Sequence, residues 1–354
     1  VIERAAVIGA GTMGLGIAGQ LANAGVPVVL LDRATAGADR NAIARRALER
    51  LLDERQPGLL HPDYLERITI GNIEDDLQLL AEVDWIAEAV VEQLEVKRSL
   101  YRTIEEVRKP GSMVTSNTST IPISLLVDGL PEGFRKTFAI THFFNPVRFM
   151  RLLELVRGED TLPEVIDCLD RFCEGRLGKG VVVCRDTPGF LGNRVGVFAI
   201  QTALHEAFRL GLAPEKADAV FGRPMGIPKT GVFGLYDLIG IDLMADVARS
   251  LEQILPPDDA FHGVSQPLPA MERMIEAGLL GNKSELGGFY RVREEAGDSI
   301  RETLDFGSFE YRAHDRTIPD IAARAETEGA IGMLIDGDDV ASRYAWAVLS
   351  RALC

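Results

Sequence analysis

The sequence predicts an α/β domain built on a doubly wound, parallel sheet, followed by a mostly α-helical C-terminal domain. Three observations lead to this prediction. Short apolar runs alternate with helical periodicity over about the first 185 residues, a glycine-rich turn joins the first run to the first helix, and β-branched runs disappear beyond that point. Alternating strands and helices give a parallel sheet that helices cover on both faces. Ligands of such sheets gather at the carboxyl ends of the strands.

The elements of the first domain follow from apolar runs and their periods. Strands are expected over residues 4–8, 26–31, 67–71, 84–91, 112–116, 136–142 and 152–156. Helices are expected over residues 15–24, 36–55 and 95–107. Pro110 and Gly111 end the last of these helices, because both residues interrupt helical structure.

The second domain is predicted from long helical periodicity. Helices are expected over residues 188–210, 239–255, 269–277, 320–328 and 338–353. Residues 294–316 are charged and aperiodic, which predicts an irregular surface connector. The expected domains are therefore residues 1–185, residues 186–292, and a connector with a partial second helical unit over residues 293–354.

The glycine turn lies between the first strand and the first helix. Gly9 allows a tight turn, Gly11 lets the backbone approach a pyrophosphate, and Gly14 lets the helix pack on the strand. The helix N-terminus then offers N–H groups to the phosphates. Asp32, at the end of the second strand, would accept hydrogen bonds from the adenosine ribose and disfavour a 2′-phosphate, although Arg33 weakens this preference.

This order of strand, turn, helix, strand and acid predicts a Rossmann-type domain that binds NAD. The alternative is a glycine-rich turn in an unrelated α/β fold. The expected cofactor contacts in this unit are Gly9, Gly11, Thr12, Met13, Gly14 and Asp32.

Composition excludes several classes of protein. The formal net charge of −15 argues against nonspecific nucleic-acid binding, which needs a basic surface. No apolar run reaches the roughly 18 residues of a membrane span, and no secretory signal precedes the first strand. The chain lacks an initiator Met, which indicates processing or a partial gene product.

The cysteine and histidine patterns carry two further expectations. Four scattered cysteines without a CxxC pair, Cys168, Cys173, Cys184 and Cys354, indicate a reducing compartment, and we expect a cytoplasmic protein. The five histidines show no HxxxH or HxH spacing, so no metal site is expected.

Three polar segments follow expected strands or open a helix. They are residues 116–120 (SNTST), residues 142–146 (HFFNP) with Glu154 beyond them, and residues 186–190 (DTPGF) with Asn193 beyond them. Removal of a hydride from a secondary alcohol needs a base whose pKa is near neutrality, which favours His142. Glu154 could orient that imidazole.

A small polar group could hold the substrate oxygen, and Ser119, Asn145 and Asn193 are the candidates. Structural roles remain open for each segment. A lone histidine at a strand end is often structural, and serines after a strand are often turn residues. Asp186-Thr-Pro-Gly also suits the start of a helix.

Together with the turn GAGTMG, the segments SNTST, HFFNPV with a glutamate twelve residues after the histidine, and DTPGFLGNR resemble the L-3-hydroxyacyl-CoA dehydrogenase family. The resemblance runs from about residue 3 to about residue 291, where Gly287-Gly-Phe-Tyr290 matches a GxGFY segment. It implies NAD-dependent oxidation of an L-3-hydroxyacyl-CoA to a 3-ketoacyl-CoA in fatty-acid β-oxidation.

The resemblance also implies residue roles. His142 is the general base, Glu154 orients it, and Ser119 rather than Ser116 contacts the substrate oxygen. Asn193 is an amide contributed by the helical domain. The other implied cofactor contacts are Glu92, Lys97, Asn117 and Asn145.

Two departures from small members of the family concern length. The segment from Pro224 to Gly234 carries extra residues and looks more like larger bacterial members, and the chain continues beyond Tyr290. We therefore expect either the dehydrogenase portion of a multifunctional protein or a complete enzyme with a short extension, with a homodimer as the expected assembly. The competing hypotheses are a hydroxyacid dehydrogenase of the 6-phosphogluconate type and a non-catalytic, crystallin-like NAD-binding protein.

Overall fold

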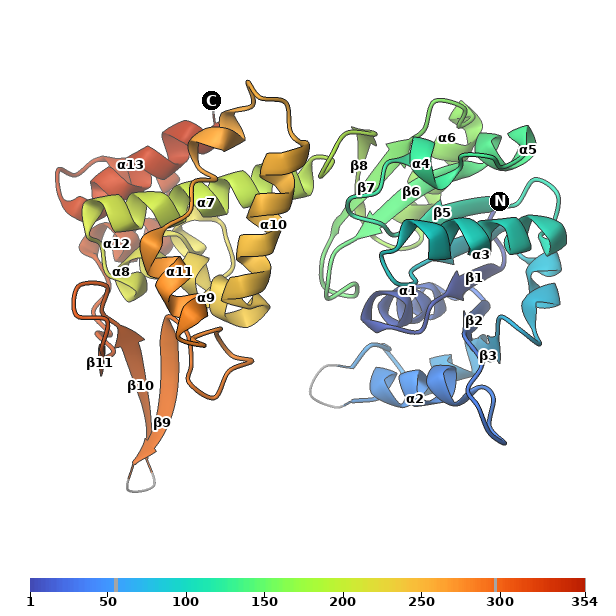
Figure 1. Cartoon of the computed structure of the whole chain (residues 1–354), viewed down its shortest axis with the longest axis horizontal. Coiled ribbons are helices and arrows are strands. Elements are labelled where there is room, and N and C mark those ends of the chain that lie inside the picture. The colour runs from blue at the N-terminus through green and yellow to red at the C-terminus, as the bar shows by residue number, and fades with distance from the viewer. Residues whose placement is uncertain (54–56, 296–297, 354) are drawn as a thin grey trace. The chain divides into compact units, whose positions relative to one another are not determined.

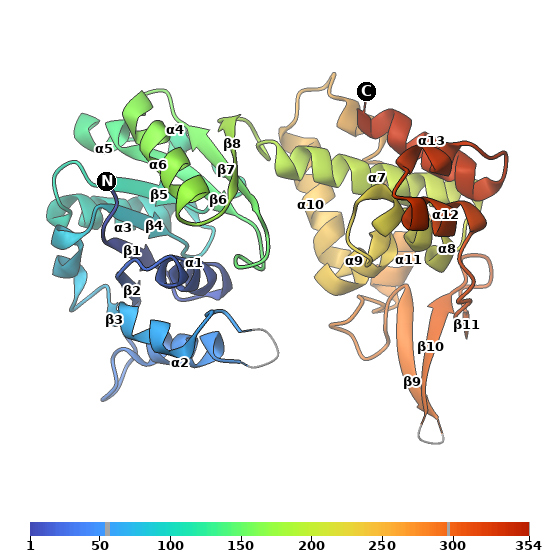
Figure 2. The ribbon, with the colours of Figure 1, turned by 180° about the vertical axis from the view of Figure 1, so that it is seen from behind.

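The computed structural model describes residues 1–53, 57–295 and 298–353 (Figures 1 and 2). The chain forms two compact units, Val1–Gly192 and Asn193–Cys354. The first contains a large sheet with helices, and the second is mostly helical with a small sheet. The predicted fold class is therefore confirmed.

The sheet of the first unit has eight strands in the order β3-β2-β1-β4-β5-β6-β7-β8. Its strands are β1 (Ala5–Ile8), β2 (Val28–Asp32), β3 (Ile68–Asn72), β4 (Trp85–Glu88), β5 (Met113–Ser116), β6 (Phe138–Phe143), β7 (Leu152–Arg157) and β8 (Gly180–Arg185). After β3 the chain crosses to the other side of β1, so the strand order reverses between β1 and β4. Ligands of doubly wound sheets bind at such a point.

Helices cover both faces of this sheet. They are α1 (Thr12–Asn23), α2 (Ala42–Leu51), α3 (Leu94–Val107), α4 (Ile123–Leu126), α5 (Glu132–Lys136) and α6 (Pro163–Gly175), with short 3₁₀ helices η1 (Pro62–Arg67) and η2 (Leu77–Glu82). The helix expected over residues 36–55 is shorter in the structure, and its predicted end lies partly outside the described residues. Helix α6 and strand β8 are absent from the prediction, although α6 buries a clear apolar face that includes Leu169 and Phe172.

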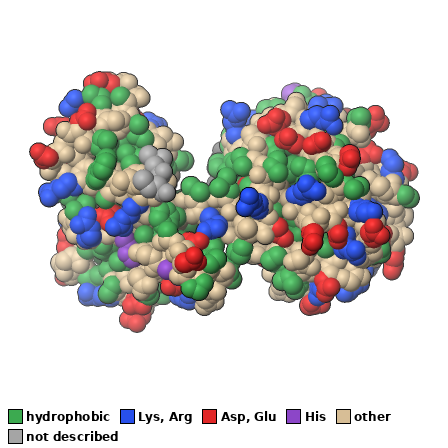
Figure 3. All heavy atoms as spheres, turned by 90° about the horizontal axis from the view of Figure 1, so that it is seen from above, with side chains coloured by type: hydrophobic (Ala, Val, Ile, Leu, Met, Phe, Trp, Pro, Cys, Tyr) green, Lys and Arg blue, Asp and Glu red, His purple; other side chains and the backbone are tan. Residues whose placement is uncertain are grey.

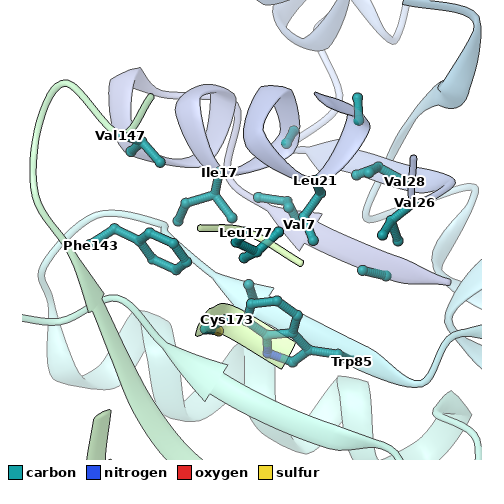
Figure 4. Close-up of a cluster of buried hydrophobic side chains, with 14 of the residues drawn as sticks. Val7, Ile17, Leu21, Val26, Val28, Trp85, Phe143, Val147, Cys173 and Leu177 are labelled. Carbon is teal, nitrogen blue, oxygen red and sulfur yellow. The ribbon is translucent and has the colours of Figure 1, made fainter. Parts of the chain in front are cut away.

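Alternate residues of the central strands enter two different cores. Val7 packs with Ile17 and Leu21 of α1 on one face, where Trp85 also lies (Figure 4). Ile8 packs on the opposite face with residues of α3, α4 and α5. Because both faces are buried, these strands are continuously apolar rather than alternating.

One expectation about the sheet is wrong: it is not parallel throughout, because β7 runs antiparallel to β6. A parallel crossover needs about a dozen residues or more, whereas only residues 144–151 separate β6 from β7. The short connection forces the chain to turn straight back. As a consequence, His142 of β6 lies directly opposite Glu154 of β7 in the ladder.

The second unit begins with the long helix α7 (Gly192–Leu210), whose first residue ends the first unit. The next helices are α8 (Pro214–Val220), α9 (Gly231–Ile239), α10 (Ile241–Ile254) and α11 (Pro269–Glu276), and α12 (Asp320–Glu328) and α13 (Val340–Leu353) follow later. Short 3₁₀ helices are η3 (Arg223–Met225), η4 (Ala260–Gly263) and η5 (Ile331–Ile335). Their shared core includes Phe233, Tyr236 and Phe289.

The irregular connector expected over residues 294–316 is also wrong. The structure has an antiparallel sheet here, in the order β11-β10-β9, formed by β9 (Tyr290–Glu295), β10 (Asp298–Leu304) and β11 (Tyr311–Ala313); residues 296–297 of the expected connector lie outside the described residues. Charged side chains pair across its strands, as the partly exposed Arg291 does with the buried Glu302 at 2.6 Å. Charge pairs on a solvent-facing sheet conceal the apolar alternation that predicts strands.

The described residues bear on membrane spans, metal sites, cysteines and surface charge. No helix among them is long and apolar enough to cross a membrane, and none of their His, Cys, Asp and Glu side chains form a group of three or more that could hold a metal ion. Cys168, Cys173 and Cys184 are free thiols, and Cys354 lies outside the described residues. On the face drawn in Figure 3, basic side chains are interspersed with acidic ones.

Candidate active site

The three glycines of the turn between β1 and α1 have different surroundings. A Cβ atom on Gly9, whose φ is +105°, would lie 2.5 Å from the carbonyl oxygen of Ala89. A Cβ on Gly14 would lie 1.8 Å from the carbonyl oxygen of Gly9, whereas a Cβ on Gly11 would meet nothing within 4 Å. Packing therefore requires Gly9 and Gly14 to be glycine, and Gly11 faces open space at the N-terminus of α1.

That N-terminus has no side-chain cap. Its first N–H groups are therefore available to an anion. Thr12 is exposed and accepts a hydrogen bond from Arg50 at 3.3 Å, while Met13 packs against the core. Asp32 lies beside the turn, because its Oδ2 accepts the N–H of Ala10 at 2.6 Å.

A matched pair of substitutions separates binding from folding at this turn. Gly11→Ala is expected to change the free energy of unfolding by less than about 1 kcal/mol, because its extended backbone suits alanine. It should weaken NADH binding by about tenfold or more, equal to about 1.4 kcal/mol, because the added methyl occupies the space of the phosphates. Gly14→Ala is expected to cost about 3 kcal/mol or more of folding stability. Urea unfolding and NADH fluorescence titration measure both effects, and equal behaviour of the two variants would contradict this interpretation.

A cavity of about 580 Å³ is lined by residues of the segments after β3 and β4 and of α3. Its apolar wall includes Ile73, Leu77, Val90 and Val96, and the N–H of Ile73 donates to the carbonyl oxygen of Asp32 at 3.0 Å. Glu74 and Glu95 also line the cavity, and a largely apolar cavity with a few polar groups suits a flat aromatic base. The sequence did not predict these residues, although Ile73 and Val90 closely follow the ends of β3 and β4, where ligands of such sheets gather.

Lys97 joins the buried Glu88 and the exposed Glu92 in a charge network at the end of β4. The Lys97 ammonium is 1% exposed and lies 2.7 Å from Glu88 Oε1 and 3.1 Å from Glu92 Oε2. Glu88 also accepts the hydroxyls of Tyr101 and Ser116, at 2.5 Å and 2.7 Å. Ser116 therefore has a structural role. Glu88 was missed, although an acid that ends an apolar strand is unusual.

Glu92 links this network to the segment that follows β5. Its Oε1 accepts the hydroxyl of Thr118 and the N–H of Ser119. Burial raises the pKa of Glu92, but the charge of Lys97 and these hydrogen bonds outweigh it and hold that pKa below its usual range. The hydroxyl of Ser119 makes no hydrogen bond with any residue that the structure describes, so it can donate to a ligand.

Asn117 connects this segment to the histidine strand. Its Oδ1 accepts the N–H of Phe143 at 2.9 Å, and its own N–H donates to the carbonyl oxygen of Glu88. The segment after β5 and the end of β6 therefore lie side by side. Asn145, beyond the strand end, is exposed.

His142 and Glu154 form a buried pair across the antiparallel ladder. The Nδ1 atom of His142 lies 2.6 Å from Oε2 of Glu154, and the two side chains are 9% and 0% exposed. An ionised carboxylate only accepts hydrogen bonds, so Nδ1 carries the proton and Nε2 is the basic atom of the neutral ring. The ring of Phe144 lies 4.5 Å from that of His142, which limits access of water.

The other oxygen of Glu154 holds the backbone ahead of α7. Its Oε1 accepts the N–H groups of Leu191 and Gly192, at 2.8 Å and 2.5 Å. Burial raises the pKa of Glu154, but the hydrogen bonds from His142, Gly192 and Leu191 together hold it below its usual range. Glu154 is therefore an ionised hydrogen-bond partner of the imidazole.

The family model described as the 3-hydroxyacyl-CoA dehydrogenase NAD binding domain matches residues 4–187, and that of the C-terminal domain matches residues 189–292. The chain belongs to the 3-hydroxyacyl-CoA dehydrogenase family. The predicted family and the predicted NAD cofactor are thereby confirmed.

Individual relatives agree with this family membership. A Rickettsia felis protein with the provisional name fatty acid oxidation complex trifunctional enzyme is 42% identical over 311 residues, which cover 88% of this chain and 43% of that protein. This member of the 3-hydroxyacyl-CoA dehydrogenase family thus spans less than half the length of that relative. A Deinococcus radiodurans protein, provisionally named a 3-hydroxyacyl-CoA dehydrogenase, is 40% identical over 83% of this chain and 84% of its own. The structure of FadB2 from M. tuberculosis matches with a TM-score of 0.66 and 31% identity, over 82% of this chain and 99% of that one.

The third polar segment of this 3-hydroxyacyl-CoA dehydrogenase family member has a role that the sequence did not predict. Asp186 Oδ2 accepts the N–H of Ile123 at 2.9 Å and so caps α4, not the helix that follows it in the chain. Burial raises the pKa of this carboxyl. Helix α7 starts later than expected, at Gly192, and Asn193 lies in its first turn in the second unit.

Proposed function

We propose that this chain oxidises L-3-hydroxyacyl-CoA thioesters to 3-ketoacyl-CoA with NAD, as part of fatty-acid β-oxidation. The observation that carries the proposal is the buried His142–Glu154 pair at 2.6 Å, next to a segment that contains the free hydroxyl of Ser119. Family membership supports the choice of a CoA thioester.

The residues at the strand ends fit a dinucleotide. Gly11 leaves the space that a phosphate needs, Asp32 offers its carboxylate to a ribose, and the cavity with Ile73 and Leu77 suits adenine. Glu92, Lys97, Asn117 and Asn145 would border the nicotinamide half. When bound, NAD supplies the acceptor for the hydride that leaves C3 of the substrate.

The chain's own residues then manage the proton and the oxygen. Nε2 of His142 accepts the proton of the 3-hydroxyl, and the Glu154 carboxylate stabilises the imidazolium that forms at Nδ1–H. The hydroxyl of Ser119 donates to the substrate oxygen as negative charge develops there. From the family resemblance we propose the amide of Asn193 as a second donor. In the reverse direction the imidazolium returns its proton to a ketone oxygen.

The name of one relative indicates the kind of protein in which this activity would occur. Because one relative carries a trifunctional name, we propose that the chain acts as the dehydrogenase part of a multifunctional protein. A homodimer and a cytoplasmic location remain predictions, which sedimentation of the purified chain and cell fractionation test.

The experiment that tests the function is a reductase assay with a series from acetoacetyl-CoA to long-chain 3-ketoacyl-CoA. We expect NADH oxidation with the thioesters, no turnover of free acetoacetate, and a preference for NADH over NADPH of about tenfold or more, because Asp32 repels a 2′-phosphate. Binding of NADH without any turnover of the series would instead favour the crystallin-like alternative. Turnover of free hydroxyacids alone would contradict the proposal.

A further inference from the structure

Lys179 is a buried lysine in the turn between α6 and β8. It is 5% exposed, and no carboxylate among the described residues pairs with its ammonium. Instead, Nζ donates to two backbone carbonyl oxygens, those of Val147 and, at 2.9 Å, Met150. Nζ also lies 5.8 Å from the centre of the Phe143 ring.

A buried ammonium without a counter-ion is costly and is retained only where hydrogen bonds compensate its desolvation. Burial lowers the pKa of Lys179 below its ordinary value. A methionine of similar length would fill the same space without that cost. The hydrogen bonds that Lys179 makes are therefore the property that a neutral side chain would lack.

Both of its acceptors belong to the loop of residues 144–151, which joins the strand of His142 to the strand of Glu154. At its start, the ring of Phe144 lies 4.5 Å from the His142 ring. In its middle, Val147 packs against α1, where a Cβ on Gly16 would lie 2.8 Å from Val147 Cγ2. Figure 4 shows Val147, Phe143 and Leu177 gathered beside Ile17 of α1. One short loop thus contacts both the base and the helix that begins at the glycine turn.

An irregular loop of this kind has backbone carbonyls without strand or helix partners. The hydrogen bond from Lys179 to Val147 is buried and the one to Met150 is partly buried, and a buried acceptor without a donor is destabilised. A single cation that holds two of them fixes the loop at two points. The adjacent backbone supports this arrangement, since the N–H of Gly180 donates to the carbonyl oxygen of Arg151 at 2.8 Å.

We propose that Lys179 is a positioning residue for the reaction. By holding the carbonyls of Val147 and Met150, it fixes the loop of residues 144–151, and this loop keeps His142 aligned with Glu154 and with the cofactor bound at the N-terminus of α1. The role rests on the proposed function. Lys179 itself touches neither substrate nor cofactor. Its effect on rate comes from the geometry of the base, because misplacement of a reacting group by about 1 Å can cost about 10²-fold in rate.

The test compares Lys179→Met with Lys109→Met as a matched control. Lys109 lies in the same unit but on the surface, where it pairs with Asp84 at 2.7 Å. Three quantities are measured for each variant: kcat with acetoacetyl-CoA, the Kd of NADH, and amide hydrogen exchange over residues 144–151. A variant with Lys179→Gln, which keeps a polar donor but not the charge, provides a second folded protein if the methionine variant is unstable.

For Lys179→Met we expect kcat to fall by about tenfold or more, exchange in the loop to rise by about tenfold or more, and the Kd of NADH to stay within about threefold. Lys109→Met should change none of these.

If Lys179→Met or Lys179→Gln lowers the melting temperature but keeps wild-type kcat, Lys179 is structural only and the proposal is wrong. Unchanged exchange in the loop also overturns it. A wild-type chain that reduces no 3-ketoacyl-CoA would instead overturn the proposed function, and the exchange measurement distinguishes the two failures because it needs no activity.

Discussion

His142→Gln is expected to lower kcat by about 10²–10⁴-fold, the usual contribution of a general base. Glutamine has nearly the same size and keeps a donor toward Glu154, so the buried pair is replaced without a cavity. What it lacks is an atom that can take a proton at neutral pH. NADH binding should hardly change, because Asp32 and the glycine turn lie on other strands. Stopped-flow reduction of acetoacetyl-CoA and NADH fluorescence titration measure the two effects.

The same substitution at His314 is the matched control. This histidine lies in the second unit just beyond β11, where Nδ1 bonds the hydroxyl of Thr303 at 2.8 Å. His314→Gln should retain wild-type turnover. Wild-type turnover in His142→Gln would disprove the assignment of the base, and a loss of NADH binding in that variant would indicate a cofactor role instead.

Glu154→Gln is expected to lower kcat by about 10²-fold or more, because the imidazolium loses its charge partner and the ring loses the acceptor that sets its tautomer. The variant is also expected to be less stable. Glu154 accepts hydrogen bonds from His142, Leu191 and Gly192 with two oxygens, and glutamine offers one oxygen and one NH₂ group. The imidazole stays paired only if its proton moves to Nε2, and all three hydrogen bonds lose their charged acceptor, which is expected to cost about 1–2 kcal/mol of unfolding free energy.

The stability difference should depend on pH with a definite sign. In the folded chain the pKa of Glu154 is lowered, despite its burial, by the hydrogen bonds from His142 and the two N–H groups. Its contribution to stability is therefore complete above the ordinary glutamate pKa of about 4.3 and is lost as pH falls through the lowered folded value. Thermal melts of wild type and Glu154→Gln should converge as the pH is lowered through this range.

Glu174→Gln provides the control for these melts, because Glu174 is an exposed residue at the end of α6 in the same unit. It should match wild type in turnover and stability at every pH. If the gap between wild type and Glu154→Gln stayed constant down to the lowest pH, Glu154 would not be the ionised partner that the geometry indicates.

Local sequence determined most of the first unit. The glycine turn, the helix after it and Asp32 lie close together in the chain, and their spacing alone dictates a strand, a tight turn and a helix N-terminus. The long apolar strands and the periodic helices were predictable for the same reason, since periodicity reports on neighbours within a few residues. The charged strands β9 to β11 were not predictable in this way, because cross-strand ion pairs such as Arg291–Glu302 replace the apolar alternation.

The tertiary structure decided how the chemistry is assembled. The sequence contains His142 and Glu154 twelve residues apart, but the antiparallel return of β7 places them opposite each other. Glu88 and Lys179 acquire their partners only when distant segments pack. Such groups carry no local pattern, because the free energy of a buried charge depends on which donors and acceptors the fold brings to it. The sequence by itself therefore determined the dinucleotide fold and the residue types of the site, and the tertiary structure determined which buried charges hold them in place.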